Sequence, residues 1–368
     1  MKILFLIHSL RKGGAERVVL NQADGLAQKG HNVHIISWLD NDEYQSEYQA
    51  VKRSFLIEKE DYKWVSSLRS SSLILNQKIQ SYKPDFIQIH TPTMIWLLGL
   101  INNKIPSLHI LHGYGSIEYK LSIKSLLLRL ITIYFTKKIN NQFVTVSPSM
   151  ISTAAKYYSN SESEYTVIQN GIDVEKFPFI ANKVSSRVNL DKHILMIGTL
   201  TANKGQLLAI DAFQLLLKHQ PSTKLLIIGD GEDKSIIKEK IQKLNLASCI
   251  KLLGIQNNIQ SFLSRGSVLW QFSKTEAMPM TVLESMASGL PVVGFDVRGI
   301  NDAVIHEETG FLVPYGDISQ AACRTLEILS DDALHKKLAL NSRQRIIKEF
   351  TNTKMVDSYE MTMQRMLS

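Results

Sequence analysis

Two carboxylates eight residues apart, Glu276 and Glu284, lie in the segment 275–293, TEAMPMTVLESMASGLPVV. Pro279 stands between them where a helix can begin, because a proline in the first turn loses no hydrogen bond that the helix would make. Gly289 stands where the helix can end, because glycine adopts the left-handed conformation of a helix cap without strain. The segment therefore predicts a loop, a helix from Pro279 to just before Gly289, and then a strand.

The start of this predicted helix is a candidate anion site. The backbone amides of Met280, Thr281 and Val282 lie at the positive end of the helix dipole, where proteins often bind phosphate groups. Glu276 precedes these amides and Glu284 lies one turn into the helix, so the two carboxylates flank a bound anion. A nucleotide sugar has that layout, with sugar hydroxyls, a diphosphate, and a ribose diol that a carboxylate accepts in bidentate fashion.

Length and composition limit the class of protein. The chain of 368 residues is too long for one ordinary hydrophobic core and predicts two domains of similar size. Its 44% hydrophobic and 21% charged residues are typical of a soluble globular protein. Cys249 and Cys323 form neither a disulfide framework nor a metal-ligand spacing, which favours a reducing compartment. The opening MKILFLI, followed by Arg11 and Lys12, predicts a buried strand rather than an export signal.

Short apolar runs alternate with amphipathic helical patterns along the chain, which predicts parallel sheets covered by helices on both faces. The clearest helical patterns are 15–28 and 66–82. The expected strands are 2–7, 32–38, 85–89, 108–111 and 143–146 in the first half, and 194–197, 224–228, 250–253, 268–270, 292–295 and 311–313 in the second. One doubly wound α/β architecture is therefore used twice.

The boundary between the halves is expected at VIQNGID, residues 167–173, because Asn-Gly is a strong turn signal and a polar stretch follows to about Lys192. We expect a first domain over 1–172 and a second over 173–351. Ligands of open parallel sheets bind beyond the carboxyl ends of the strands, so site residues should lie in the loops that follow the strands.

Glu276, seven residues, Glu284 and then SMASGLPVV are similar to the signature of the retaining glycosyltransferases of family 4. The signature is specific because it joins a spacing to a helix start, a glycine stop and an apolar strand. The resemblance implies the GT-B fold, an α/β fold of two Rossmann-like doubly wound domains with a cleft between them. It also implies that the last helix, 352–368, returns to the first, acceptor-side domain, and that the second domain binds the nucleotide sugar.

In the first domain the resemblance points to two loops. Gly13 and Gly14 follow the first strand and resemble the family's glycine loop, which faces the donor phosphate and the acceptor. His112, in LHGYG, matches the family's active-site histidine, whose usual role is to bind the donor sugar rather than to act as a base. His90 is a candidate for the acceptor pocket, and His8 is expected to cap a strand end.

In the second domain Lys204 is the candidate cation for a diphosphate leaving group. The family usually has an arginine directly after the first glycine of this loop. Thr199 stands there, so Lys204 and the helix amides would neutralise more of the charge. Gly229 resembles the family's second glycine turn, and Gly254 with Ile255 falls where the family holds the nucleotide base.

No metal and no other cofactor is expected. His8, His90 and His112 follow strands, but no carboxylate or cysteine accompanies them at ligand spacing. Asp40 and Asp42 form an Asp-x-Asp pair, with which some glycosyltransferases of another fold hold a metal-bound diphosphate. Because this pair lies in a polar loop beside other acidic residues, it predicts a solvated turn.

Together with this resemblance, the sequence predicts a retaining, metal-independent hexosyltransferase. It would use a nucleotide diphosphate sugar and a glycan or lipid-linked glycan acceptor in surface polysaccharide synthesis, without a nucleic-acid partner. No acidic residue occurs from Gly254 to Phe262 to bind the two donors of guanine, so a UDP-sugar is favoured over GDP-mannose. Two alternatives stay open: a weakly active binding subunit, which Thr199 supports, and a sugar-nucleotide epimerase or hydrolase. Residues 8–16 lack Gly-x-Gly-x-x-Gly, which excludes a dinucleotide oxidoreductase.

A basic helical pattern covers residues 117–138, IEYKLSIKSLLLRLITIYFTKK. Most of the chain's formal charge of +8 lies in residues 1–172. Two interpretations stay open, a core helix with a solvated basic face and an amphipathic helix in the headgroup layer of an anionic membrane. We expect a cytoplasmic protein in peripheral contact with the inner face of the cell membrane. The apolar positions of the pattern are Leu121, Leu127, Leu128, Ile131 and Phe135, and the basic ones are Lys120, Lys124, Arg129, Lys137 and Lys138.

Overall fold

The computed structural model describes residues 1–61, 66–114, 123–179 and 192–368. The chain divides into two compact units, the first formed by Met1–Gly171 with Asn352–Ser368 and the second by Ile172–Thr351. The expected boundary after Ile172 lies one residue from this division. The polar stretch expected to reach about Lys192 lies, over 180–191, outside the described residues.

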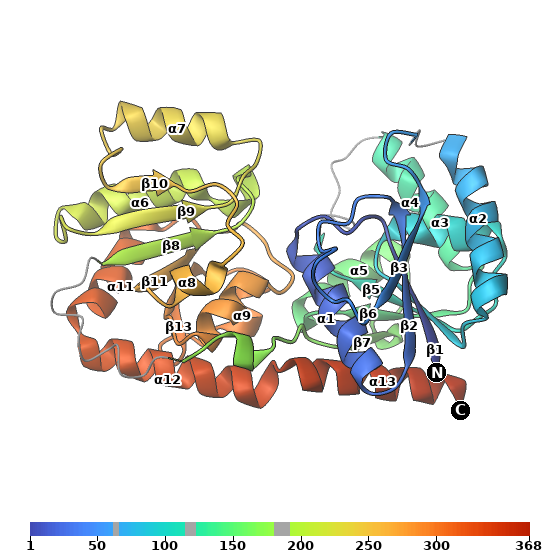
Figure 1. Ribbon diagram of the computed structural model, residues 1–368. Coiled ribbons are helices and arrows are strands. Elements are labelled where there is room, and N and C mark those ends of the chain that lie inside the picture. The colour runs from blue at the N-terminus through green and yellow to red at the C-terminus, as the bar shows by residue number, and fades with distance from the viewer. Residues whose placement is uncertain (62–65, 115–122, 180–191) are drawn as a thin grey trace. The chain divides into compact units, whose positions relative to one another are not determined.

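The first unit is built on a parallel seven-stranded sheet in the order β3-β2-β1-β4-β5-β6-β7 (Figure 1). Its strands are β1 (Lys2–Ile7), β2 (Asn32–Leu39), β3 (Lys52–Ile57), β4 (Phe86–Ile89), β5 (Ser107–Leu111), β6 (Asn141–Thr145) and β7 (Tyr165–Val167). Its helices are α1 (Gly14–Gln28), α2 (Ser66–Tyr82), α3 (Pro92–Leu100), α4 (Ile123–Thr136), α5 (Ile151–Tyr158) and α13 (Asn352–Leu367).

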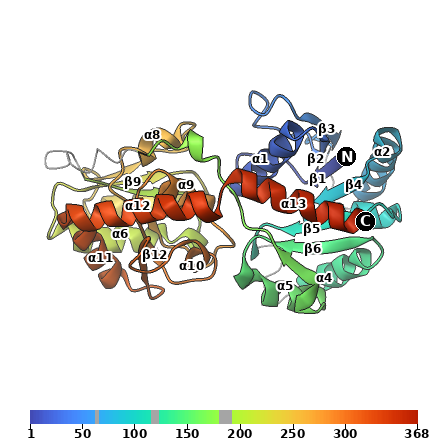
Figure 2. The same cartoon turned by 90° about the horizontal axis from the view of Figure 1, so that it is seen from below.

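Strand register decides which face of this sheet each residue covers. Gln88 of β4 pairs with Phe5 of β1 and contacts Gln22 of α1 and Met363 of α13. These two helices lie side by side along the sheet (Figure 2). The neighbouring residue Ile87 points to the opposite face and packs into a core with side chains of α2 and α3. Both faces are covered, which is why these strands are continuous apolar runs.

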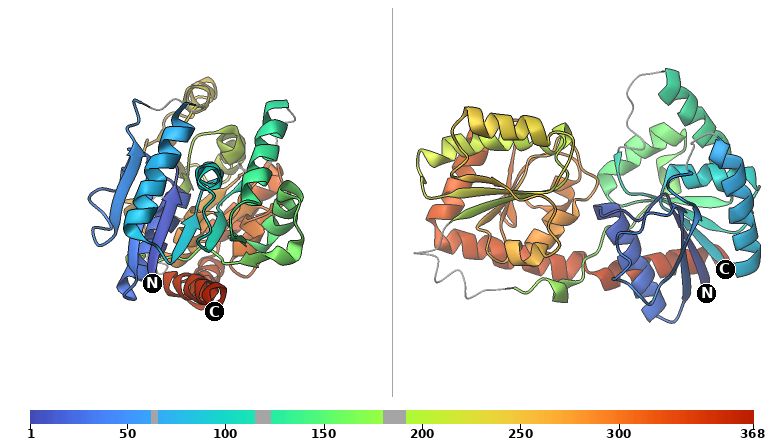
Figure 3. Two further views of the ribbon diagram at one scale, coloured as in Figure 1. Left: turned by 90° about the vertical axis from the view of Figure 1, so that its right-hand side faces the viewer. Right: turned by 45° about the horizontal axis from the view of Figure 1, so that its top comes forward.

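The second unit holds a parallel six-stranded sheet in the order β10-β9-β8-β11-β12-β13, with helices on both faces (Figure 3). Its strands are β8 (His193–Ile197), β9 (Lys224–Ile228), β10 (Ile250–Leu252), β11 (Val268–Gln271), β12 (Val292–Phe295) and β13 (Gly310–Val313). Its helices are α6 (Gln206–Leu217), α7 (Lys234–Lys243), α8 (Ile259–Leu263), α9 (Met280–Ala287), α10 (Ile300–Ala303), α11 (Ile318–Ser330) and α12 (Asp332–Glu349).

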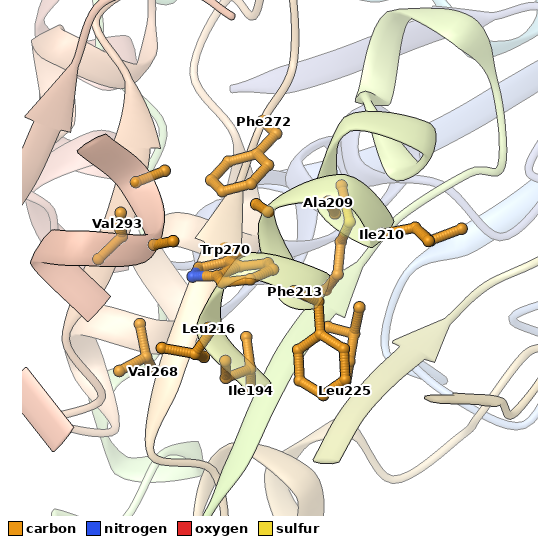
Figure 4. Close-up of a cluster of buried hydrophobic side chains, with 14 of the residues drawn as sticks. Ile194, Ala209, Ile210, Phe213, Leu216, Leu225, Val268, Trp270, Phe272 and Val293 are labelled. Carbon is orange, nitrogen blue, oxygen red and sulfur yellow. The ribbon is translucent and has the colours of Figure 1, made fainter. Parts of the chain in front are cut away.

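The core of the second unit surrounds Trp270 of β11 (Figure 4). The Trp270 ring meets that of Phe213 on α6 edge to face, with centroids 6.4 Å apart, and stacks on Phe272 at 4.9 Å. Its indole N–H donates to Thr325 of α11 at 2.8 Å, so the buried donor is satisfied. Because side chains alternate along a strand, the next residue, Gln271, points to the other face, where it meets α9.

The predicted doubly wound α/β fold is confirmed. Two strands, β3 and β7, are absent from the predicted set, and both are edge strands. β3 keeps most of its residues partly exposed and so lacks the apolar run of a buried strand, and β7 has only three residues. Among the described residues, no helix combines the length and the apolar character needed to cross a membrane.

The first unit buries one histidine between aromatic rings. His109 of β5 is 0% exposed and lies between the rings of Phe143 and Tyr158, with centroids 5.4 and 5.3 Å away. Neither of its ring nitrogens has a hydrogen-bond partner among the residues that the structure describes. Burial disfavours the charged imidazolium and lowers the pKa of His109 to about 3.

We predict that His109→Phe makes the stability of the protein less dependent on pH. In the unfolded chain the histidine pKa is near 6.5, so below that pH the unfolded state binds a proton that the folded state excludes. Above this pH His109 does not make the free energy of unfolding depend on pH. Below it, the free energy of unfolding falls by about 1.4 kcal/mol per pH unit because of this residue. Urea unfolding at several pH values between about 7 and 5 measures the slope. Equal slopes in the two proteins would contradict the prediction.

Candidate functional site

The candidate site lies where the strand order of the second sheet reverses. From β8 the chain winds outward through β9 and β10 on one side, and it returns through β11 to β12 and β13 on the other. In open parallel sheets such a reversal is the place where ligands bind beyond the strand ends. Lys204 follows β8 and Glu276 follows β11, so these two predicted residues stand on the two sides of the reversal.

The structure brings Lys204 and Glu276 into direct contact. Lys204 Nζ lies 2.5 Å from Glu276 Oε1, and the two side chains are only 26% and 12% exposed. The same oxygen accepts hydrogen bonds from Ser273 Oγ at 2.7 Å and from Gln271 Nε2 at 3.0 Å. Sequence reasoning missed Ser273 and Gln271, although a glutamine that closes an otherwise apolar strand is a visible signal.

The loop that carries Glu276 is fixed from both sides by backbone contacts. On one side the Lys274 amide donates to the Asn203 carbonyl at 2.7 Å, and on the other the Glu276 amide donates to the Arg298 carbonyl at 3.3 Å. Gly299 has φ +82°, and a Cβ there would lie only 2.1 Å from the Glu276 carbonyl oxygen. Glycine is therefore required for this close approach.

Helix α9 begins at Met280, one residue later than predicted, with Pro279 as its N-cap. The prediction of three available amides is wrong for Val282, whose N–H lies 3.1 Å from the Pro279 carbonyl oxygen. An N-cap residue already has its carbonyl in the helical hydrogen-bond pattern, which explains the difference. The amides of Met280 and Thr281 have no recorded acceptor among the described residues, and the Thr281 hydroxyl donates to Gln271 Oε1 at 3.2 Å.

The other end of α9 has the predicted glycine cap. Gly289 has φ +71°, and the Leu290 amide donates to the Ser285 carbonyl at 2.9 Å, the bond that defines a Schellman motif. A Cβ on Gly289 would lie 2.4 Å from the ring of Phe179. Glu284, within the helix, is 2% exposed, so it is not a solvated surface charge.

The predicted glycines of the second unit lie in adjoining loops. The Gly229 amide donates to the Gly254 carbonyl at 2.8 Å. A Cβ on Gly229 would lie 2.0 Å from the Gly198 carbonyl oxygen, so this glycine allows two backbones to meet. Thr199 and Ile255 are exposed on these loops, Ile255 to 66%. A large apolar side chain exposed at a strand end is available to a flat ligand group.

In the first unit, the structure joins His112 to His90. His112 Nε2 and His90 Nδ1 are 2.9 Å apart, and the His90 ring also stacks on Phe5. Burial lowers the pKa of His112 to about 4 and that of His90 well below its usual value. Both rings are therefore neutral near pH 7, and they can exchange hydrogen bonds but carry no charge. His8 lies 3.4 Å from the Thr93 hydroxyl, at the reversal between β1 and β4.

The glycine loop of the first unit makes contacts within the protein. The Gly13 amide donates to the Tyr44 hydroxyl at 3.2 Å, and a Cβ on Gly13 would meet the carboxylate of Glu16. Gly14 begins α1 and is exposed. A hydroxyl of the protein thus accepts the Gly13 amide, and the expectation that this loop faces the donor phosphate stays a prediction.

The Asp-x-Asp pair is not a solvated turn. Asp42 Oδ2 pairs with Arg53 at 3.0 Å, and its other oxygen accepts the Tyr44 amide at 2.9 Å. Over the described ranges, no group of three His, Cys, Asp or Glu side chains is placed to hold a metal ion. The thiols of Cys249 and Cys323 are free.

Two family models match the chain. Residues 12–176 match the model described as Glycosyltransferase Family 4, and residues 180–345 match the model described as Glycosyl transferases group 1. N-acetyl-alpha-D-glucosaminyl L-malate synthase of Bacillus anthracis is 31% identical over 137 residues, which cover 37% of this chain and 36% of that protein. The UDP-Gal:alpha-D-GlcNAc-diphosphoundecaprenol alpha-1,3-galactosyltransferase of Escherichia coli is 26% identical over 300 residues, covering 78% of this chain and 77% of that protein.

A crystal structure of Anabaena Alr3699/HepE in complex with UDP-glucose superposes with a TM-score of 0.82 at 19% sequence identity, covering 99% of this chain and 100% of that chain. This likeness shows the GT-B fold, which defines the class of the protein. Because the two family models together match most of the sequence, the chain belongs to the family 4 glycosyltransferases. The resemblance drawn from the segment 275–293 is thereby confirmed.

We predict that Gly289→Ala destabilises the protein by more than Gly316→Ala does. Both glycines have a positive φ, +71° and +84°, so each substitution incurs the left-handed strain of about 1–2 kcal/mol. At Gly316 a Cβ meets nothing within 4 Å, whereas at Gly289 it meets the Phe179 ring. Urea unfolding of both variants measures the difference between their losses of unfolding free energy, which is the contribution of the contact with the Phe179 ring. Equal losses would show that Phe179 moves aside without cost.

Proposed function

We propose that this glycosyltransferase moves a hexosyl group from a UDP-sugar to a glycan or lipid-linked glycan acceptor, with retention at the anomeric carbon and without a metal ion. The observation that carries the proposal is the contact of Lys204 with Glu276 beside the start of α9. A cation, a carboxylate and two amides with no acceptor among the described residues lie at the strand ends of one sheet, which supports the proposal. A UDP-sugar is supported by two similar proteins, since the E. coli relative is a UDP-Gal galactosyltransferase and the Anabaena structure is a complex with UDP-glucose.

Each part of the donor has a partner of suitable chemistry. The ammonium of Lys204 and the amides of Met280 and Thr281 neutralise the diphosphate, since a helix start attracts anions. Glu276 accepts hydrogen bonds from hydroxyls of the sugar, and Glu284 accepts them from the ribose diol. Lys204 has three N–H donors, so it can keep its bond to Glu276 while it binds a phosphate oxygen.

The proposed reaction breaks the bond between the anomeric carbon and the diphosphate oxygen. The acceptor hydroxyl forms its new bond to that carbon on the same face, and its proton passes to the leaving diphosphate, so that the products are the glycosylated acceptor and UDP. Lys204 stabilises the negative charge that develops on the diphosphate oxygen. His112 is neutral and would therefore hydrogen-bond a sugar hydroxyl rather than neutralise charge.

We predict that Glu284→Gln and Glu276→Ala separate nucleotide binding from transfer. Glu284→Gln should weaken UDP binding by at least about tenfold, because a hydrogen bond to a charged acceptor contributes about 1.5–3 kcal/mol. Glu276→Ala should leave the Kd of UDP unchanged and abolish most sugar transfer, since it acts on the sugar. Calorimetry with UDP and release of UDP from UDP-sugars measure the two effects.

Glu239→Gln, an exposed position on α7 of the same unit, is the matched control and should behave as the wild type. An unchanged Kd of UDP in Glu284→Gln would remove Glu284 from the nucleotide site. Incubation of the wild type with UDP-sugars also decides between the alternatives. A transferase without acceptor releases UDP only slowly, whereas a hydrolase releases it as its main reaction. An epimerase alters the sugar, and a binding subunit does none of these.

We further propose that α4 rests on an anionic membrane surface. Leu128, Ile131 and Phe135 pack onto the core of the first unit. A second apolar side points outward, and it includes Leu127 of the predicted apolar positions. It consists of Leu126, Leu127, Leu130 and Tyr134, each 54–57% exposed. Exposed Lys137 and Lys138 follow this side, and Lys138 lies 4.5 Å from the Tyr134 ring centroid. Apolar side chains edged by cations match the chemistry of an anionic headgroup layer.

Other predicted cations of this helix contribute less to the proposal. The guanidinium of Arg129 donates to the carbonyls of Tyr157 and Lys156, so it is engaged with α5. Lys120 and Leu121 lie outside the described residues, as does the side chain of Lys124.

We predict that the protein sediments with phosphatidylglycerol vesicles at low salt and less at high salt. The double variant Leu127→Ser/Leu130→Ser should bind at least about tenfold more weakly, because burying a leucine side chain contributes about 1.5–3 kcal/mol. Leu73→Ser on α2, which is 57% exposed, is the matched control and should bind as the wild type. Protein that remains in the supernatant at low salt would overturn the membrane proposal and leave a soluble acceptor as the better candidate.

A further inference from the structure

Gln271 is a buried polar residue in an apolar strand. The other residues of β11, Val268, Leu269 and Trp270, are apolar and 0% exposed, and Gln271 at the carboxyl end is 4% exposed. Burying an amide is unfavourable unless its hydrogen bonds are made. An aliphatic side chain at this position would pack in the strand equally well. We therefore look for a role of the glutamine amide other than packing.

The amide of Gln271 has hydrogen bonds at both of its ends. Its Nε2 donates to Ser273 Oγ at 2.8 Å and to Glu276 Oε1 at 3.0 Å. Its Oε1 accepts from the Thr281 hydroxyl at 3.2 Å. Two N–H groups and one oxygen are thereby engaged, and the side chain connects the Glu276 loop with the first turn of α9.

The two oxygens of Glu276 have different surroundings. Oε1 accepts from Lys204, Ser273 and Gln271, which exhausts the lone-pair directions of one carboxylate oxygen. Among the described residues no hydrogen bond to Oε2 is recorded. The three donors therefore orient the carboxylate with one oxygen held by the protein and the other left for a ligand.

We propose that Gln271 is a positioning residue for the donor sugar. It holds the Glu276 carboxylate so that Oε2 receives the sugar hydroxyls, and through Thr281 it keeps this carboxylate in register with the amides that bind the diphosphate. The inference rests on the proposed function, because the sugar is what the oriented oxygen recognises. Ser273 assists by donating to the same oxygen as Gln271.

Gln271→Met tests the inference, because methionine fills a similar volume without hydrogen bonds. It should lower kcat/KM for the UDP-sugar by at least about tenfold and leave the Kd of UDP within about twofold of the wild type. In a Glu276→Ala background it should have no further effect on kcat/KM, since it acts through that carboxylate. An equal loss of affinity for UDP and UDP-sugar, or full additivity with Glu276→Ala, would overturn the proposal.

Two further variants guard against a loss that is merely structural. Gln22→Met in the first unit removes another buried glutamine, which is 0% exposed and bonded to Gln88 at 2.7 Å. This variant should lower the free energy of unfolding but leave both kcat/KM for the UDP-sugar and the Kd of UDP unchanged. If Gln271→Met fails to fold, Ser273→Ala removes one of the three donors to Oε1 and should give a smaller loss of kcat/KM with the Kd of UDP retained. No loss in Ser273→Ala would overturn the proposed role of these donors.

A measurement without substrate separates this inference from the proposed function. In the wild type the side-chain amide protons of Gln271 should exchange slowly with solvent, and in Glu276→Ala they should exchange faster, as observed by NMR. If the Gln271 amide protons exchange slowly but the protein turns over no UDP-sugar, the proposed function is overturned. The hydrogen bonds that orient the Glu276 carboxylate would still be supported. Equal exchange in the two proteins would overturn the positioning role whatever the activity.

Discussion

The chemistry proposed for the second unit depends on one ion pair at the reversal of its sheet. Lys204 and Glu276 come from the loops after β8 and β11, and both side chains are mostly removed from water. Charges withdrawn from water lose hydration, and their mutual attraction offsets this loss only when further hydrogen bonds are made. Ser273 and Gln271 make those bonds, so the polar side chains beside the pair follow from its burial.

The framework around this pair is made of backbone packed against backbone. At Gly299 and Gly229 a side chain would collide with the carbonyl of a neighbouring loop, and at Gly289 with the ring of Phe179. Loops that touch at this distance have little freedom to shift. The ammonium, the carboxylate and the start of α9 are therefore held in place before a ligand arrives, which reduces the reorganisation that binding requires.

The two units place different chemistry at the same kind of position. Both sheets reverse their strand order beside the first strand of the unit, but the second unit presents a cation and a carboxylate there, and the first presents histidines. Burial keeps His90 and His112 neutral, so the first unit offers hydrogen bonds without charge. In the proposed reaction the negative charge of the donor is consequently met by the second unit.

The sequence by itself determined the doubly wound fold, because strands buried on both faces must be continuous apolar runs; the partly exposed edge strand β3 lacks that signal. It also determined α9 with its glycine cap, because these features depend on residues a few positions apart. Only the tertiary structure decided that Gln271 joins the site, that Tyr44 accepts the Gly13 amide, and which side of α4 is exposed. The physical reason is that hydrogen-bond partners and covered faces are set by elements far apart in the chain, which local periodicity does not record.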